Sequence, residues 1–289
     1  MTEQFGTEES NNTYVLDAES AVEMARLLDQ DKVLTQAMGG IFPEQADSDL
    51  PNVSCILDIA CGPGGWAFEV ARSYPHIEVT GIDISKNTIE YARAQAKLLN
   101  LSNVHFEVMD ALKSLQFTDN TFDLVNMRTV VAFVVPELWP QFLQECKRVL
   151  KPGGVIRVTE AELGISSKPA FETLMQKLAL AIRRANRSFS PIGTQIGITP
   201  FLRPLLEQAG FQQVKMKPHV VDSSYGSPGH EGSYQDIKML LEISRPLLVQ
   251  TRAITEQEFD ALGPQVLQEM QEEDYYGLGY MLTVWGVKP

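Results

Sequence analysis

The stretch LDIACGPGGWAFEVA (Leu57–Ala71) places three glycines between a short apolar run and a helical pattern. Glycine tolerates positive φ and lets another group approach the main chain closely. Gly62, Gly64 and Ala67 fit the loose G-x-G-x-x-G/A pattern that follows the first strand of nucleotide-binding sheets. The stretch therefore predicts a strand, a ligand-binding turn and a helix, in that order.

Strand-like and helix-like segments alternate outward from this turn. The expected strands are 54–60, 77–85, 104–110, 122–127, 155–161, a segment near 211–222, and LGYMLTVWGV at 278–287. Strands that alternate with helices form a mostly parallel sheet that is covered on both faces. We therefore expect an α/β fold with a doubly wound, Rossmann-like sheet of seven strands.

The composition limits the classes of partner. The chain has 289 residues, 44% of them hydrophobic, and a net charge of -13. Such a surface repels nucleic acid unless a basic patch compensates. The one visible basic cluster is Arg183, Arg184 and Arg187, which suits either a solvated helix face or contact with an anionic substrate. We expect a small-molecule substrate and no nucleic acid.

Cysteine usage and the N-terminus bear on the compartment. Cys55, Cys61 and Cys146 form no disulfide framework and suit a reducing compartment. The first residues, MTEQFGTEESNNTYV, lack the pattern of a signal peptide. No apolar run approaches the roughly 20 residues that span a bilayer. The expectation is a soluble, cytoplasmic protein without a membrane segment.

Acidic residues around the glycine turn narrow the choice of ligand. Asp83 lies 21 residues after Gly62, at the end of the second strand, where a carboxylate accepts ribose hydroxyls of a dinucleotide or of another nucleoside. A P-loop is excluded because no Gly-Lys-Ser/Thr follows the turn. Asp58, Asp83 and Asp110 surround the expected site without a lysine or arginine. Carboxylates disfavour a pyrophosphate and stabilise an ammonium or sulfonium, so they favour a cationic nucleoside without phosphate.

Five segments then establish a family resemblance. LDIACGPGG, VTGIDIS, VMDA, FDLVNMR and VLKPGGVIRVTE occur in the order and spacing typical of class I S-adenosylmethionine-dependent methyltransferases. Residues 54–161 resemble that family closely, and GYMLTVWGVKP (279–289) resembles its antiparallel seventh strand. The resemblance implies S-adenosylmethionine as cofactor and S-adenosylhomocysteine as product.

The resemblance also implies a set of cofactor-binding residues. The glycines pass under the methionine part, Asp83 holds the ribose diol, and Asp110 reads the adenine. The implied residues are Tyr14 as a lid residue, Asp58, Ala60, Gly62, Gly64, Asp83, Ile84, Met109, Asp110, Ala111, Asn126 and Met127.

The sequence says less about the residues that bind the methyl acceptor and assist the transfer. A sulfonium is intrinsically activated, so methyl transfer is an in-line displacement that depends mainly on positioning and on exclusion of water. The catalytic candidates are Glu160, His219 and His230, each with a structural or packing role as the alternative. Arg128 and Tyr225 are candidates for substrate contact, and no metal site is expected.

We expect the following organisation: an N-terminal helical lid segment (1–50), a cofactor-binding methyltransferase core (51–163), a cap insertion (164–198), the continued core (199–222), a second helical cap insertion (223–274) and a final core strand (275–289). The expected activity is methyl transfer from S-adenosylmethionine to a small organic acceptor. The alternatives are an NAD-type dinucleotide-dependent oxidoreductase, or a protein of this fold that binds the cofactor without transferring a methyl group. The oligomeric state stays open, with a homodimer among the choices.

Overall fold

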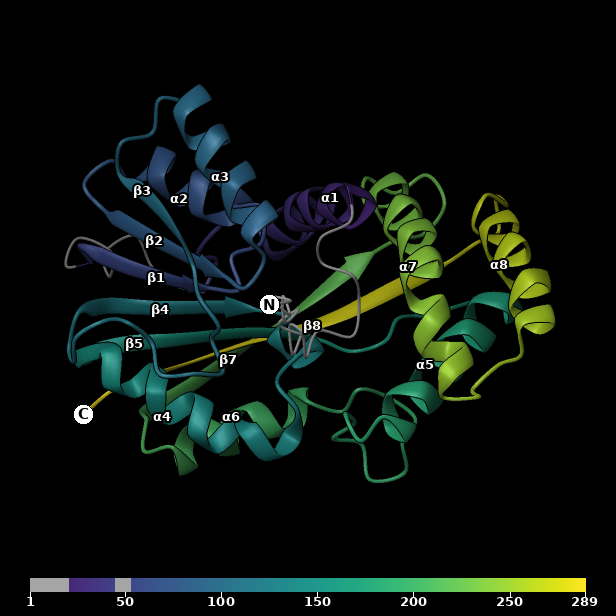
Figure 1. The fold of residues 1–289 in the computed structure, drawn as a ribbon. Helices are drawn as coiled ribbons and strands as arrows, with labels where there is room; N and C mark the ends of the chain where they lie inside the picture. Colours follow the sequence, from purple (N-terminus) through teal and green to yellow (C-terminus); the bar gives the residue numbers. More distant parts are fainter. Residues whose placement is uncertain (1–20, 45–52) are drawn as a thin grey trace, which may run out of the picture.

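The computed structural model describes residues 21–44 and 53–289, which form one central sheet with helices on both faces (Figure 1). The strand order is β3-β2-β1-β4-β5-β8-β6, and β7 pairs with β8. The strands are β1 (Cys55–Ile59), β2 (Glu78–Asp83), β3 (Val104–Val108), β4 (Phe122–Arg128), β5 (Leu150–Ala161), β6 (Ile165–Ser166), β7 (Gln212–Asp222) and β8 (Gly277–Val287).

The sheet is parallel from β3 to β5, and β8 runs antiparallel to both β5 and β7. The α/β class, the doubly wound sheet and the antiparallel last strand are therefore confirmed. One prediction needs correction, because the sheet has eight strands among the described residues and not seven. The extra strand is β6, a two-residue strand that pairs with the start of β8. So short a segment has no period by which the sequence could predict it.

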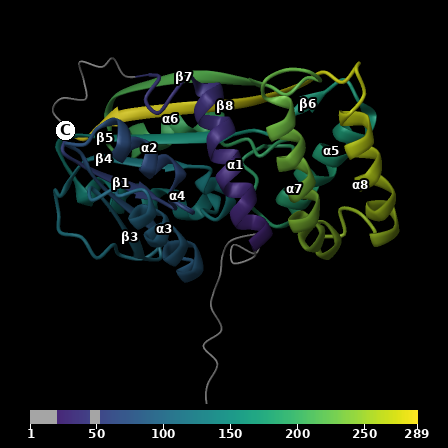
Figure 2. The same cartoon turned by 90° about the horizontal axis from the view of Figure 1, so that it is seen from above.

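The helices form three groups, one on each face of the sheet and one at an end of the molecule. Figure 1 shows α2 and α3 on the face that α1 also covers, with α4 and α6 on the opposite face. Helices α5, α7 and α8, here called the cap, gather at one end of the molecule (Figure 2). The helices are α1 (Ala21–Met38), α2 (Gly65–Ser73), α3 (Lys86–Leu98), α4 (Trp139–Val149), α5 (Pro169–Arg184), α6 (Thr199–Gln208), α7 (His230–Gln250) and α8 (Glu256–Met270), with short 3-10 turns η1 (Val130–Ala132) and η2 (Pro136–Leu138).

Each of these three groups of helices packs around its own apolar cluster. Trp139 and Phe142 of α4 pack against the sheet from one side, and Trp66 of α2 and Ile89 of α3 pack from the other. The cap helices share a third cluster that includes Phe171. The cap is therefore held by burial of its own apolar side chains as well as by its links to the sheet.

Local end signals agree with most helix boundaries. The Ser85 hydroxyl accepts a hydrogen bond from the Thr88 amide, and Thr255 forms a capping box with Glu258. Gly210 follows α6 with a φ of 84°. The sequence predicts Ser85 as an N-cap, a capping box at Thr255 and Glu258, and Gly210 at the C′ position, and these observations confirm all three.

The sequence also predicts a capping box at Ser233 and Asp236 and an N-cap at Thr199, and these two helix starts differ in the structure. Ser233 and Asp236 form no capping box, because α7 already begins at His230 and the Ser233 amide donates to the Gly229 carbonyl within the helix. Thr199 was expected to precede α6 and is its first residue. The Glu162 carboxylate caps this helix instead, by accepting hydrogen bonds from the amides of Gly197 at 2.7 Å and Thr199 at 3.0 Å. A cap from so far along the chain leaves no local signal.

Helix α1 determines how the site is enclosed. It contacts α2 on one side and α7 and β7 on the other, so it lies across the sheet between the core helices and the cap (Figure 2). Gly39 and Gly40 follow it with positive φ angles of 87° and 123° and turn the chain back. Phe42 then packs edge-on against Trp66 at 5.5 Å between ring centroids, which fixes the end of this segment to α2.

Candidate functional site

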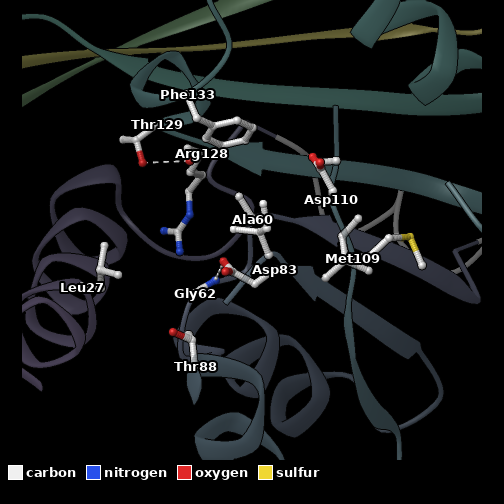
Figure 3. Close-up of a pocket in the computed structure, with 13 residues that line it drawn as sticks. Leu27, Ala60, Gly62, Asp83, Thr88, Met109, Asp110, Arg128, Thr129 and Phe133 are labelled. Carbon is white, nitrogen blue, oxygen red and sulfur yellow. Dashed lines mark hydrogen bonds between the residues drawn. The ribbon is translucent and has the colours of Figure 1, made fainter. Parts of the chain in front are cut away.

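A pocket lies at the carboxyl ends of β1, β2 and β4, where open parallel sheets bind ligands (Figure 3). This edge pocket encloses about 750 Å³, its open mouth included. It is lined by Leu27, Ala60, Gly62, Ile82, Asp83, Ile84, Thr88, Met109, Asp110, Ala111, Arg128, Thr129 and Phe133. The structure therefore brings seven of the predicted cofactor residues to one pocket.

The backbone of the glycine turn forms the floor of the edge pocket. Ala60, Gly62 and Gly64 all have positive φ angles, of 55°, 54° and 91°. A Cβ atom at Gly64 would lie 2.7 Å from the Phe106 ring, so a side chain there would have to displace that ring. The main chain of the turn therefore lines the pocket on one side and packs tightly against the Phe106 ring on the other.

Asp83 connects β2 to the glycine turn. One carboxylate oxygen accepts a hydrogen bond from the Gly62 amide at 3.1 Å, and the other accepts from the Ser85 amide at 2.9 Å. Burial raises the pKa of Asp83, and these backbone donors partly offset that effect. Each oxygen keeps a second acceptor position, which suits a pair of vicinal hydroxyls.

Asp110 lies at the opposite side of the pocket from Arg128 (Figure 3). Its carboxylate accepts a hydrogen bond from the Leu112 amide at 3.0 Å and lies 3.3 Å from the exposed Lys113 ammonium. Met109, Ala111 and Ile84 line the same part of the pocket. Apolar walls beside one acceptor suit a flat ring that carries a donor group.

A buried polar chain leads away from the turn through the sheet. The Asn126 amide donates to Asp58 at 2.7 Å and accepts from Arg157 at 2.8 Å, and Arg157 pairs with Glu44 at 2.5 Å. Asp58, Asn126 and Arg157 are neighbours in register on β1, β4 and β5. Burial raises the pKa of Asp58 to about 7, against the opposing effects of Asn126 and Arg157. Arg157 and Glu44 are not among the residues that the sequence predicts for the site.

Arg128 lies in the edge pocket, so the expectation that no lysine or arginine lies beside the acids of this site is wrong. Its guanidinium pairs with Asp31 of α1 and donates to the Thr35 hydroxyl at 3.1 Å. Burial and the charge of Arg157 lower the pKa of Arg128 to about 9. Asp31, Leu34, Asp58 and Arg128 line a small side cavity that continues from the pocket. The sequence does not predict Asp31 or Leu34 as site residues, because nothing near them in sequence indicates that α1 crosses this edge.

Glu160 is fully buried on β5 and lines neither the edge pocket nor the side cavity. One carboxylate oxygen accepts a hydrogen bond from the Val131 amide at 3.0 Å. The other has no hydrogen-bond partner among the described residues, and burial raises the pKa of Glu160 to about 8. Through this hydrogen bond Glu160 can hold η1, the turn that follows β4, in place.

The two candidate histidines lie in different places. His219 is buried on β7, 3.0 Å from the Thr283 hydroxyl, and burial lowers its pKa. His230 begins α7, and its ring lies between those of Tyr225 and Tyr275, at centroid distances of 5.4 and 6.0 Å. The structure does not bring Glu160, His219 and His230 together into one catalytic group.

A second cavity, here called the cap cavity, lies between the strand ends and the cap. It encloses about 920 Å³, mouth included. Most of its lining is apolar, from Val33, Leu34, Ala161, Leu163, Phe171, Met175, Val221, Ile237, Leu240, Met270, Leu278, Tyr280 and Met281. Leu34 lines both this cavity and the side cavity, so the two adjoin at α1. Tyr225 is not among its lining residues.

The basic cluster and three further predicted residues lie away from these cavities or outside the described residues. The guanidinium groups of Arg183, Arg184 and Arg187 donate to the carbonyls of Ile192, Thr251 and Ala132, which supports a structural role for that cluster. Asn126 and Met127 are fully buried in β4, and Tyr14 lies outside the described residues. In the part of the chain that the structure describes, no helix has the length and apolar character needed to cross a bilayer.

Comparison with known proteins adds sequence relatives. Residues 56–154 match a family described as a methyltransferase domain. The chain is 31% identical over 180 residues to a demethylmenaquinone methyltransferase of Staphylococcus haemolyticus, a match that covers 56% of this chain and 70% of the relative.

Solved structures are similar at the level of the fold. A phosphoethanolamine N-methyltransferase of Haemonchus contortus, crystallised with S-adenosylhomocysteine, has a TM-score of 0.52 and 18% identity over 88% of this chain and 53% of that one. The [4+2]-cyclase SpnF has a TM-score of 0.51 and 19% identity over 93% of this chain and 96% of its own. At these identities the likeness describes the fold alone, since the two proteins carry different activities.

Proposed function

Because the chain belongs to the class I S-adenosylmethionine-dependent methyltransferases, we propose that its edge pocket binds the cofactor and that its cap cavity holds a small organic acceptor. One observation carries this assignment. The side cavity that continues from the edge pocket adjoins the cap cavity at Leu34. A methyl group bound beside the side cavity therefore lies next to space for an acceptor.

The residues of the edge pocket fit the cofactor. Asp83 has acceptor positions for the ribose hydroxyls, and Asp110 lies in the apolar part that suits the adenine. Arg128 and Asp31 offer opposite charges to the carboxylate and ammonium of the methionine part. Asp58, at the inner end of the side cavity, adds negative charge that stabilises a cation.

The oxidoreductase alternative fits this pocket poorly. A dinucleotide carries a pyrophosphate, which needs backbone donors and cations around it. Among the described residues that line the edge pocket, Arg128 is the sole cation, whereas a pyrophosphate carries two negative charges. Asp58 and Asp83 would face the phosphates at close range. These charges favour the methyl donor over the dinucleotide.

The cofactor supplies an activated methyl group when it is bound, and the chain supplies position. The turn after β1 and Asp83 orient the nucleoside, while Leu34 of α1 lines both the side cavity and the cap cavity, where the two adjoin. Glu160 holds the amide of Val131 and thereby the turn that follows Arg128, which makes it a positioning residue. Transfer then depends mainly on alignment and exclusion of water.

A label-transfer assay tests the proposed function. Protein is incubated with S-adenosylmethionine carrying a tritiated methyl group and with an organic extract of cells, and label is counted in the solvent-extracted products. We expect protein-dependent label in those products, and loss of that label in Ser233→Trp, which fills the cap cavity. Lys238→Trp, on the exposed side of α7, is the matched control. Cofactor binding without any label transfer would instead favour the non-transferring alternative.

A cytoplasmic location is part of the same proposal. Cys55, Cys61 and Cys146 are free thiols, and Cys146 is buried. Unpaired cysteines suit the reducing conditions of the cytoplasm.

A further inference from the structure

We propose that the cap cavity selects an uncharged, largely apolar acceptor and holds one oxygen of it at Tyr275 and Ser223. This inference rests on the proposed function, because it assigns the chemical class of the acceptor to the cavity in which that function places it. It concerns how the acceptor is bound at the cap end of the cavity, and not the methyl-transfer step.

The charges around the cap cavity exclude anions. Its described lining contains no lysine, arginine or histidine, whereas Glu162 and Asp236 both contribute to it. Glu162 is already engaged, because its carboxylate accepts hydrogen bonds from the Gly197 and Thr199 amides at the start of α6. A phosphate or carboxylate on the acceptor would lose its hydration there without gaining a cation, which is unfavourable.

The walls of the cavity suit an apolar body. Phe171 and Met175 of α5 face it from one side, Leu240 of α7 from another, and Met270 of α8 closes the cap side. All of these except Leu240 are buried, although they border open space. Methionine side chains adapt to irregular apolar shapes, so the cavity can accommodate a ring system or a branched hydrocarbon.

The polar groups of the cavity converge on one place. Tyr275 is fully buried, and within residues 21–44 and 53–289 its hydroxyl has no hydrogen-bond partner of good geometry. The Ser223 hydroxyl lies beside it, and both residues line the cavity. Buried polar groups are almost always hydrogen-bonded, and the neighbouring Ser223 hydroxyl satisfies that of Tyr275 only in part, so this pair of hydroxyls at the cavity wall indicates a ligand atom. Burial also raises the pKa of Tyr275, which keeps the hydroxyl protonated as a donor.

His230 fixes this polar end in place. Its ring contacts the Tyr275 ring at 6.0 Å, and its Nδ1 lies 3.1 Å from the Ser223 carbonyl oxygen. Its Nε2 is buried and has no partner in the described part of the chain. His230 does not line the cavity, so we assign it to positioning of Tyr275 and Ser223 rather than to catalysis.

Matched naphthyl compounds test the acceptor class. The protein is saturated with S-adenosylhomocysteine and titrated by fluorescence with 1-naphthol, naphthalene, 1-naphthyl phosphate and 1-naphthylmethylamine. We expect 1-naphthol to bind at least about tenfold more tightly than the phosphate and about fivefold more tightly than naphthalene. Tighter binding of the phosphate or of the amine than of the naphthol would overturn the proposal, and so would no binding of any of the four.

Two tyrosine variants test the residues. In Tyr275→Phe the advantage of 1-naphthol over naphthalene should fall to within about twofold, while binding of naphthalene is unchanged. Tyr276→Phe, on the exposed neighbouring tyrosine, should leave both affinities as they are. An unchanged advantage in Tyr275→Phe would refute the role of that hydroxyl. Calorimetry with S-adenosylhomocysteine on the same samples separates the two proposals, because loss of cofactor binding would count against the proposed function instead.

Discussion

The Asp83 carboxylate accepts a hydrogen bond from the Gly62 amide at 3.1 Å, which ties the end of β2 to the turn after β1. The same carboxylate accepts from Ser85 at the start of α3. One side chain therefore positions two strands and a helix around the place proposed for the ribose. Removal of its charge should affect the cofactor more than the fold, because the turn is also held by the Cys61 amide, which donates to the Ile82 carbonyl.

Asp83→Ala should weaken binding of S-adenosylhomocysteine by at least about 30-fold, since it removes hydrogen bonds from a charged acceptor to two hydroxyls. Asp83→Asn retains one acceptor oxygen and should lie between the wild type and the alanine variant. Thermal shift with increasing S-adenosylhomocysteine measures the effect. Glu90→Ala, on the exposed side of α3, serves as control. Equal shifts in Asp83→Ala and the control would show that the ribose is bound elsewhere.

Asp58 should make cofactor affinity depend on pH. Its pKa is raised to about 7 by burial, so it is largely protonated in mildly acidic solution. A cationic cofactor favours the ionised carboxylate, so binding releases a proton and affinity should rise from about pH 5.5 to about pH 7.5. Asp58→Asn removes the titration and should flatten this rise. Calorimetry across that range checks it, and an unchanged slope in the variant would assign the proton to another group.

Glu160 should make the folded protein less stable as the pH rises, whereas Asp58 should make cofactor affinity increase. Its pKa is about 8 in the folded protein and near 4.5 in the unfolded chain, so the folded state binds the proton more tightly. Its contribution to stability is complete below about pH 4.5 and is lost as pH rises through about 8. Glu160→Gln does not titrate, so the melting temperature of the variant should gain on the wild type over that interval.

Two controls accompany the Glu160 variant. Glu137→Gln, at an exposed site in η2, should show no pH-dependent difference. Because the glutamine side chain of Glu160→Gln can still accept from the Val131 amide, methyl transfer should stay within about threefold of the wild type. A loss of a hundredfold or more would return Glu160 to a catalytic role.

Glu44 and Arg157 form an ion pair in which neither side chain is exposed. Glu44→Ala leaves a buried guanidinium without its partner and should lower the free energy of unfolding by about 3 to 5 kcal/mol. Glu44→Leu combined with Arg157→Met should cost less than the single change, because apolar groups replace both charges. Urea unfolding gives both values. A single variant within about 0.5 kcal/mol of the wild type would contradict the buried pair.

The sequence predicts best those features that depend on residues close to one another in the chain. The glycine turn, the position of Asp83 at a strand end and the Ser85 cap each depend on residues within one β–α unit, and all are found. Periodic apolar runs predict the core strands for the same reason. The sequence could not predict that Glu162 caps α6 or that Asp31 meets Arg128, because the packing of distant segments creates these contacts. For that reason the sequence predicts substrate contact for Arg128 and not its pairing with Asp31.

Calorimetric titration with S-adenosylhomocysteine and, separately, with NADH tests the central claim most directly. The edge pocket, with Asp58, Asp83 and Asp110 around it, predicts one S-adenosylhomocysteine site per chain with a Kd in roughly the micromolar range, and no measurable heat with NADH. Binding of NADH in preference to S-adenosylhomocysteine would contradict the account.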